Sequence, residues 1–308
     1  MSNVLYIIGN GFDIHHKLST KYCHYFLFLQ KKHPNILNDM NASKFFNGVD
    51  TVDIVGSSPE DYNKLWSNLE MMLEFAYEDY FEETVDCYAP DYAEEHPNFG
   101  GVIFQVDDDK APFSKFTNDY LIEWIKSAES GKCVKDNSLN LSSKNYYLSF
   151  NYTNTLQSIY NIPDTKILHI HGSLKENLAN GRPLQFGNPE SSAKCLQQRL
   201  ENKYADHPCG SWVTDAIHGV VDLCKALTKN PKQNYEPLKF FIQNKSFGEV
   251  VVMGHSFMGV DRPYYDDVIV PCLEKCKWKF FYHNDDDRAN VQKFKQAHPT
   301  ICVDEEHW

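Results

Sequence analysis

Two polar side chains in the middle of the chain could carry out acid–base chemistry on a bound ligand. Asn151 follows an aromatic, β-prone segment, and His171 ends the segment 166–171, directly before Gly172-Ser173. An imidazole can accept a proton near neutral pH, and a carboxamide can orient a sugar hydroxyl or a water molecule. Turn formation is the alternative for Asn151. For His171 the alternatives are a core position or, with His169 on the same face, a metal site, although no third ligand is apparent nearby.

Two glycine-containing turns could come close to phosphate groups. The β-prone run 4–8 is too short for a helix and stops at Gly9-Asn10-Gly11, which is followed by Phe12-Asp13. Glycine allows close approach to a pyrophosphate, but the turn lacks the third glycine of the dinucleotide fingerprint, so by itself the signal is weak and a tight connection that needs positive φ is the alternative. The turn Gly254-His255-Ser256 follows a second apolar run, and there we expect Ser256 to contact a phosphate or ribose.

The turn at Ser256 also invites comparison with the G-x-S-x-G elbow of serine hydrolases. Its fifth position is Met258, with Gly259 displaced by one residue, and the strained elbow tolerates a large side chain poorly. A serine hydrolase that uses Ser256 is therefore a further hypothesis, which an absence of labelling by a fluorophosphonate probe would remove.

These residues need a scaffold that brings several strand ends together. Strand-like segments recur at 4–8, 146–150, 166–171, 184–186, 249–253 and 277–283, with helical segments between most of them. This alternation predicts an α/β fold with a Rossmann-like parallel sheet flanked by helices. Ligands bind at the carboxyl ends of such strands, so Gly187, Asn188 and Asn284, which also follow predicted strands, join the expected site.

A mainly helical segment interrupts the predicted sheet. We expect residues 1–32 and 141–308 to form the Rossmann domain, and residues 33–140 to form a helical insertion or lid. Helical periodicity begins at Ser58 within this insertion, and the acids Asp107–Asp109 are expected in an exposed loop.

Composition excludes several classes of partner. The chain has 308 residues, with 42 Asp and Glu against 30 Lys and Arg, and this net charge of −12 repels nucleic acid and anionic membranes. The nine scattered cysteines are typical of reduced thiols rather than of a disulfide framework. No apolar run has the length of about 20 residues that spans a bilayer, and no export signal is apparent. We therefore expect a cytoplasmic protein.

Taken in order, these segments resemble the bacterial abortive-infection AbiH family and, in fold, the sirtuins. The motifs that carry the resemblance run nearly end to end: 5–14, 66–70, 149–153, 167–173, and 254–256 with Asp261. The resemblance implies a sirtuin-like sheet that binds NAD, with Asn151 and His171 as the catalytic residues at the reacting ribose.

The resemblance also implies which residues bind the cofactor. Gly9, Asn10 and Gly11 correspond to a phosphate loop, Asp13 to the polar residue beyond it, and Asn284 to an adenosine-side contact. The turn Gly254-His255-Ser256 corresponds to a Gly-Thr-Ser type turn in which histidine replaces threonine. The predicted cofactor-binding set comprises Gly9, Asn10, Gly11, Phe12, Asp13, Gly187, Asn188, Gly254, His255, Ser256 and Asn284.

Two departures from the sirtuin pattern limit what can be carried over. Only 12 residues, none of them cysteine, lie between Ser173 and Phe186, so a four-cysteine zinc module cannot fit and no metal is expected. The acid that normally follows the reactive asparagine by two residues is replaced by Thr153.

The resemblance leads to a leading and an alternative function in phage defence. The first is an NAD glycohydrolase, which cleaves the nicotinamide–ribose bond. The second is a non-catalytic nucleotide-sensing or interaction module of a defence complex, which Thr153 favours. The expected partners are a dinucleotide and either a phage-derived trigger or a defence protein, and a homo-oligomer is one assembly that the sequence allows.

Overall fold

The computed structural model describes residues 3–37, 69–88, 100–189, 191–205, 210–257 and 259–308, which divide into two compact units. The first unit comprises Met1–Thr20, Ile122–Gln185 and Asn230–Trp308, and the second comprises Lys21–Leu121 and Phe186–Lys229. The predicted insertion, 33–140, overlaps the second unit but lacks its segment after Gln185. The insertion as a separate domain stays a prediction.

The first unit is built on a six-stranded sheet whose neighbouring strands are all parallel. The strands are β1 (Asn3–Ile8), β2 (Tyr146–Ser149), β3 (Ile167–His169), β4 (Phe247–Met253), β5 (Lys277–Tyr282) and β6 (Val303–His307). Their order across the sheet is β3-β2-β1-β4-β5-β6, which is the strand order of dinucleotide-binding Rossmann folds. The predicted α/β fold with a Rossmann-like parallel sheet is confirmed.

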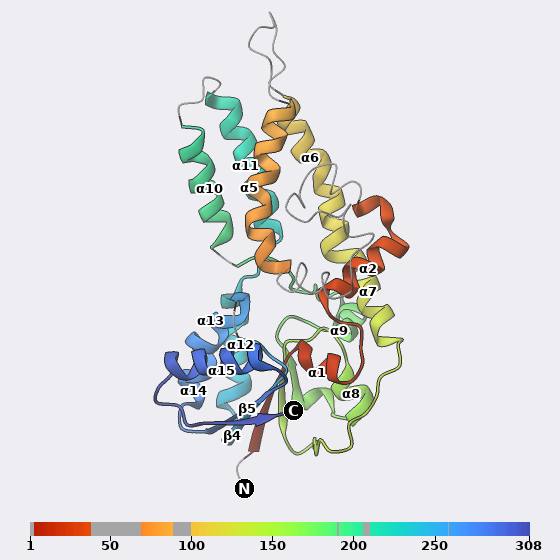
Figure 1. Ribbon diagram of the computed structural model, residues 1–308, viewed down its shortest axis with the longest axis vertical. Coiled ribbons are helices and arrows are strands. Elements are labelled where there is room, and N and C mark those ends of the chain that lie inside the picture. The colour runs from red at the N-terminus through yellow and green to blue at the C-terminus, as the bar shows by residue number, and fades with distance from the viewer. Residues whose placement is uncertain (1–2, 38–68, 89–99, 190, 206–209, 258) are drawn as a thin grey trace, which may run out of the picture. The chain divides into compact units, whose positions relative to one another are not determined.

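Helices cover both faces of this sheet (Figure 1). The helices of this unit include α1 (Asn10–His15), α8 (Thr155–Tyr160), α9 (Leu174–Asn180), α12 (Tyr235–Gln243), α13 (Arg262–Tyr264), α14 (Val270–Leu273) and α15 (Asp285–Ala297). Successive strand residues point to opposite faces, so Ile7 and Val252 pack in one core cluster with residues of α12 to α15. Ile8 and Val251 pack in the other, with Phe12 of α1 and residues of α8.

The second unit is helical. It contains α2 (Tyr22–Lys32), α5 (Leu69–Tyr88), α6 (Gly101–Ser114), the π-helix η2 (Lys115–Asp119), α10 (Ser192–Lys203) and α11 (Gly210–Ala226). Figure 1 shows α5, α6, α10 and α11 alongside one another, and each packs against its neighbours. The helix α7 (Tyr120–Glu129) connects the second unit to the first.

Three expectations about local structure differ from the structure or lie outside it. Asp107–Asp109 belong to α6 rather than to an exposed loop, and Asp109 is buried, where it accepts a hydrogen bond from Tyr80 at 2.7 Å. The segment 184–186 is not a strand in the structure; Leu184 and Phe186 are both buried, and the boundary between the two units falls between Gln185 and Phe186. The helix predicted to start at Ser58 lies outside the described residues.

Among the described helices, none has the length and apolar character to cross a bilayer.

Candidate functional site

The carboxyl ends of β1 and β4 lie side by side at the centre of the sheet. The chain leaves β1 toward β2 on one side and leaves β4 toward β5 on the other, so the strand order reverses between them. In open α/β sheets a crevice forms at such a switch point, and ligands bind there. The two glycine-containing turns that begin at Gly9 and Gly254 leave these two strand ends.

These two turns pack backbone against backbone. The Gly9 amide donates to the Met253 carbonyl at 3.0 Å, and the Gly11 amide donates to the Gly254 carbonyl at 2.8 Å. A Cβ at Gly9 would lie 2.5 Å from the His255 Cα, and one at Gly254, where φ is +63°, would lie 2.3 Å from the Phe12 nitrogen. The glycines are therefore required by contact between the turns, and the amides of Gly9 and Gly11 already have carbonyl partners.

The other residues of the two turns differ in exposure. Phe12 is fully buried in the core, and its amide donates to the Gly9 carbonyl at 2.9 Å. Asn10 and Ser256 are exposed, and the Asn10 side chain donates to the Thr20 carbonyl at 2.8 Å. Of the residues in these turns, Asn10 and Ser256 are thus the ones whose side chains can meet a ligand directly.

Asn151 and Asp13 belong to a buried hydrogen-bond network behind the first turn. Asn151 Nδ2 donates to the Gly9 carbonyl at 3.0 Å, which ties the end of β2 to the end of β1. Thr153 Oγ1 donates to Asp13 Oδ2 at 2.5 Å, and Thr155 Oγ1 donates to Asp13 Oδ1 at 2.7 Å. Both oxygens of this carboxylate therefore have a hydroxyl donor.

Burial raises the pKa of Asp13 to about 6, against the opposing effect of the hydrogen bonds from Thr153, Thr155 and Asn151. The structure thereby gives Thr153 a role as a hydroxyl donor to the buried carboxylate. An aspartate there would place a second carboxylate beside a buried one, whereas a hydroxyl donates to it.

His169 is fixed within the sheet. Its Nδ1 lies 3.0 Å from the Asn151 carbonyl and its Nε2 lies 3.0 Å from Gln157 Nε2. A carbonyl only accepts and an amide nitrogen only donates, so His169 is neutral with its proton on Nδ1. Burial lowers its pKa in agreement with this assignment.

His171 and His255 meet on one carboxylate. His171 Nε2 lies 2.8 Å from Asp261 Oδ1, and His255 Nε2 lies 3.5 Å from Asp261 Oδ2. The His171 and His255 side chains are 1% and 4% exposed, and that of Asp261 is 17% exposed. The Phe150 ring lies against both imidazoles, with centroid distances of 5.4 Å to His171 and 4.0 Å to His255.

Sequence reasoning placed Asp261 in a motif but gave it no role, and it did not single out Tyr265. The Tyr265 hydroxyl lies 3.1 Å from His255 Nδ1, and burial, with a smaller effect from the charge on Asp261, raises its pKa well above the ordinary value. A carboxylate shortly after a His-containing strand-end turn is the signal that could have identified Asp261.

Three further predicted residues follow Phe186 or strand β5. Gly187 and Asn188 belong to the second unit, where the Gly187 amide donates to Glu70 Oε1 at 3.2 Å. Asn188 is fully buried, and its side chain donates to Cys224 Sγ at 3.4 Å. Asn284 is exposed and caps α15, where its Oδ1 accepts from the Asp287 amide at 2.8 Å.

Within the described part of the chain, no base is hydrogen-bonded to Ser256, as a serine hydrolase would require. Ser256 Oγ has no hydrogen bond to any described residue, and His255 Nδ1 accepts from the Phe257 amide at 2.8 Å. Nor do the described residues contain three or more His, Cys, Asp or Glu side chains arranged to hold a metal ion.

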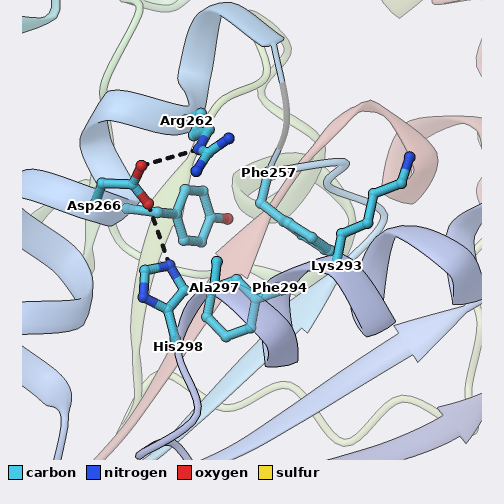
Figure 2. Close-up of a pocket in the computed structure, with 8 residues that line it drawn as sticks. Phe257, Arg262, Asp266, Lys293, Phe294, Ala297 and His298 are labelled. Carbon is cyan, nitrogen blue, oxygen red and sulfur yellow. Dashed lines mark hydrogen bonds and ion pairs between the residues drawn. The ribbon is translucent and has the colours of Figure 1, made fainter.

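A separate pocket of about 210 Å³ lies among α13, the π-helix η6 (Tyr265–Ile269) and α15 (Figure 2). Its lining residues are Phe257, Arg262, Tyr265, Asp266, Lys293, Phe294, Ala297 and His298. Figure 2 shows Asp266 between two basic groups, with Arg262 Nε at 2.9 Å and His298 Nε2 at 3.2 Å. The pocket shares Tyr265 with the histidine pair but contains none of the predicted site residues.

The chain is similar to a known protein family over most of its length. A family model described as bacteriophage abortive infection AbiH matches residues 5–282. This range contains Asn151, His171 and Asp261, so the candidate site lies within the matched part of the chain. Neither a curated protein nor a solved structure matches the chain.

Proposed function

We propose that this chain, which belongs to the AbiH family of bacteriophage abortive infection proteins, binds NAD at the carboxyl ends of β1, β2 and β4 and hydrolyses it to nicotinamide and ADP-ribose. Family membership supports a role in phage abortive infection. The sirtuin-like character of the sheet and its use of NAD are part of the proposal.

The observation that carries the proposal is an imidazole paired with a carboxylate at the edge of the sheet where Rossmann folds bind dinucleotides. His171 follows β3 by two residues, and its Nε2 lies 2.8 Å from Asp261 Oδ1. Asn151 follows β2 and is anchored to the turn after β1. A base and an orienting carboxamide are therefore held by adjacent strands.

The proposed reaction needs one base and one oriented water molecule. His171 accepts a proton from water, and the water oxygen forms a bond to C1′ of the ribose. The bond from C1′ to the nicotinamide nitrogen breaks, and its electron pair stays on that nitrogen, so nicotinamide leaves neutral. The proton then passes from His171 to solvent, and Asn151 orients the ribose or the water.

The turns support the phosphate contacts only in part. The amides of Gly9 and Gly11 donate to backbone carbonyls, so the pyrophosphate would meet the exposed residues Asn10 and Ser256 instead. The Asn284 side-chain oxygen could accept a hydrogen bond from an adenosine only if it gave up the bond that it accepts from the Asp287 amide. We therefore assign the ligand contacts first to Asn10, Ser256, Asn151 and His171.

The test is the direct detection of products. Purified protein is incubated with NAD, with and without phage lysate, and nicotinamide and ADP-ribose are separated by chromatography. We expect His171→Ala and Asn151→Ala each to lower the rate by at least about a hundredfold, which is the low end of what a positioned acid–base group contributes. His218→Gln, which removes an exposed imidazole in the second unit, should leave the rate unchanged. Turnover that survives both alanine substitutions would refute the assignment.

The burial of the site favours a second candidate, a non-catalytic nucleotide sensor. Asn151 is 7% and His171 is 1% exposed, and Asn151 and Thr153 both have hydrogen-bond partners within the protein. Isothermal titration with NAD and with ADP-ribose separates the two functions. Stable binding without product formation would support the sensor, whereas release of nicotinamide during the titration would support the hydrolase.

A further inference from the structure

We infer that Asp261 is a positioning residue that holds His171 and His255 as the same tautomer, with the proton on Nε2, and thereby makes Nδ1 of His171 the nitrogen that accepts a proton. This inference rests on the proposed function for its catalytic meaning. Its tautomer assignment rests on hydrogen bonds alone and can be tested without activity.

The assignment for His171 follows from its partner. A carboxylate oxygen only accepts, so the 2.8 Å contact between His171 Nε2 and Asp261 Oδ1 requires a proton on Nε2. In the neutral ring the lone pair then lies on Nδ1. A proton taken up there would place a full positive charge beside the Asp261 carboxylate, which stabilises it, as the buried aspartate does in a Ser-His-Asp triad.

The assignment for His255 is fixed from its other side. The Phe257 amide donates to His255 Nδ1 at 2.8 Å, so this nitrogen is an acceptor and cannot carry a proton. The Tyr265 hydroxyl lies 3.1 Å from the same nitrogen. The proton of the neutral ring is therefore on Nε2, 3.5 Å from Asp261 Oδ2. Each oxygen of Asp261 thus faces one imidazole N–H.

The surroundings keep these orientations in place. Phe150 and Tyr264 meet the His171 ring edge to face, with centroid distances of 5.4 and 5.6 Å. Tyr265 is fully buried, and its hydroxyl is directed to His255. His255 does not act on the ligand in this scheme, because its role is to hold the second oxygen of Asp261 and so to fix the rotation of that carboxylate. A side chain with one fewer acceptor cannot hold both rings.

The kinetic arm of the test compares Asp261→Asn with Asp266→Asn. The amide at position 261 keeps one acceptor but loses the charge and presents an N–H₂ group to one imidazole. We expect kcat for NAD to fall by at least about tenfold, KM to change by less than about twofold, and the acid limb of the kcat profile to move to lower pH. Asp266→Asn removes a nearby carboxylate whose partners are Arg262 and His298, and it should change none of these quantities.

The second arm uses nitrogen-15 NMR of the labelled histidines, assigned with a His171→Gln variant. In the unmodified protein we expect neutral His171 and His255 to carry their protons on Nε2, and we expect Asp261→Asn to give His171 a mixed tautomer population. A proton on Nδ1 of His171 in the unmodified protein would overturn the inference, even if Asp261→Asn failed to fold. If no NAD is consumed but the tautomers are as expected, the proposed function fails and the assignment of Asp261 stands.

Discussion

Replacement of Asp13 by asparagine should change how the stability of the protein depends on pH. In the folded protein the pKa of Asp13 is raised by burial from its ordinary value of 3.8 to about 6. The folded state then holds a proton that the unfolded state has released, so stability falls as pH rises through this interval. Because one pKa unit corresponds to about 1.4 kcal/mol, the whole interval corresponds to about 3 kcal/mol, of which about 2 kcal/mol lies between pH 4 and pH 7.

Asparagine has nearly the same shape and does not titrate. Its carbonyl can accept from Thr153 or Thr155, and the other hydroxyl can rotate to accept from the amide. The free energy of unfolding, measured by urea denaturation with tryptophan fluorescence at pH 4, 5, 6 and 7, should therefore shift in favour of Asp13→Asn by about 2 kcal/mol over this range. Asp108→Asn, at an exposed position, should show no such shift. A difference between Asp13→Asn and the unmodified protein that stays constant from pH 4 to pH 7 would refute the reasoning.

Two further predictions concern the second unit. Lys229→Met should lower the free energy of unfolding by about 3 kcal/mol, because it removes a buried ammonium that lies 2.7 Å from the Glu70 carboxylate. The double variant Lys229→Met, Glu70→Gln should recover part of this loss, as measured by urea denaturation. Gly187→Ala should lower the melting temperature far more than Gly181→Ala does. A Cβ at Gly187 would lie 1.6 Å from the Leu227 carbonyl oxygen, whereas a Cβ at Gly181 would meet no atom within 4 Å. Similar melting temperatures for the two glycine variants would contradict the structure.

The central strands could be predicted because their sequences are continuous apolar runs. Ile7, Ile8 and the run Val250 to Met253 are β-prone and buried between two layers of helices, so propensity and burial agree. The strand β6 could not be found in this way, because its residues Val303–His307 are mostly charged and partly or fully exposed. Charges of this kind are common on edge strands, where they discourage pairing with another chain.

Two misassigned segments show where local patterns mislead. Asp109 looks like part of a solvated acidic run, but it shares the buried face of α6 with Val102, Val106 and Phe113, which recur at helical spacing. The alternation of apolar residues at 184–186 suggests a strand, yet it arises because the chain passes from one unit to the other there. A sequence pattern indicates that a side chain is buried, but it does not indicate which of the two cores contains that side chain.

The candidate site could be predicted as a set of strand ends but not as a set of contacts. Asn151 and His171 lie where the alternation of strands and helices placed them, after β2 and β3. Their partners Gly9 and Asp261 are 142 and 90 residues away in the chain, and only the folded sheet brings them together. For the same reason, the hydroxyl–carboxylate contact between Thr153 and Asp13 has no local signature.

The close contact between the turns after β1 and β4 limits how this protein can be studied. Side chains at Gly9, Gly11 or Gly254 would push apart the two strands on which the rest of the sheet is built. Loss of activity after such a substitution would therefore reflect damage to the sheet. It would give no information about whether the turns bind a ligand. Mutational screens that interpret intolerance at glycines as proof of phosphate binding would reach the wrong conclusion here, and the exposed neighbours Asn10 and Ser256 are the positions to vary instead.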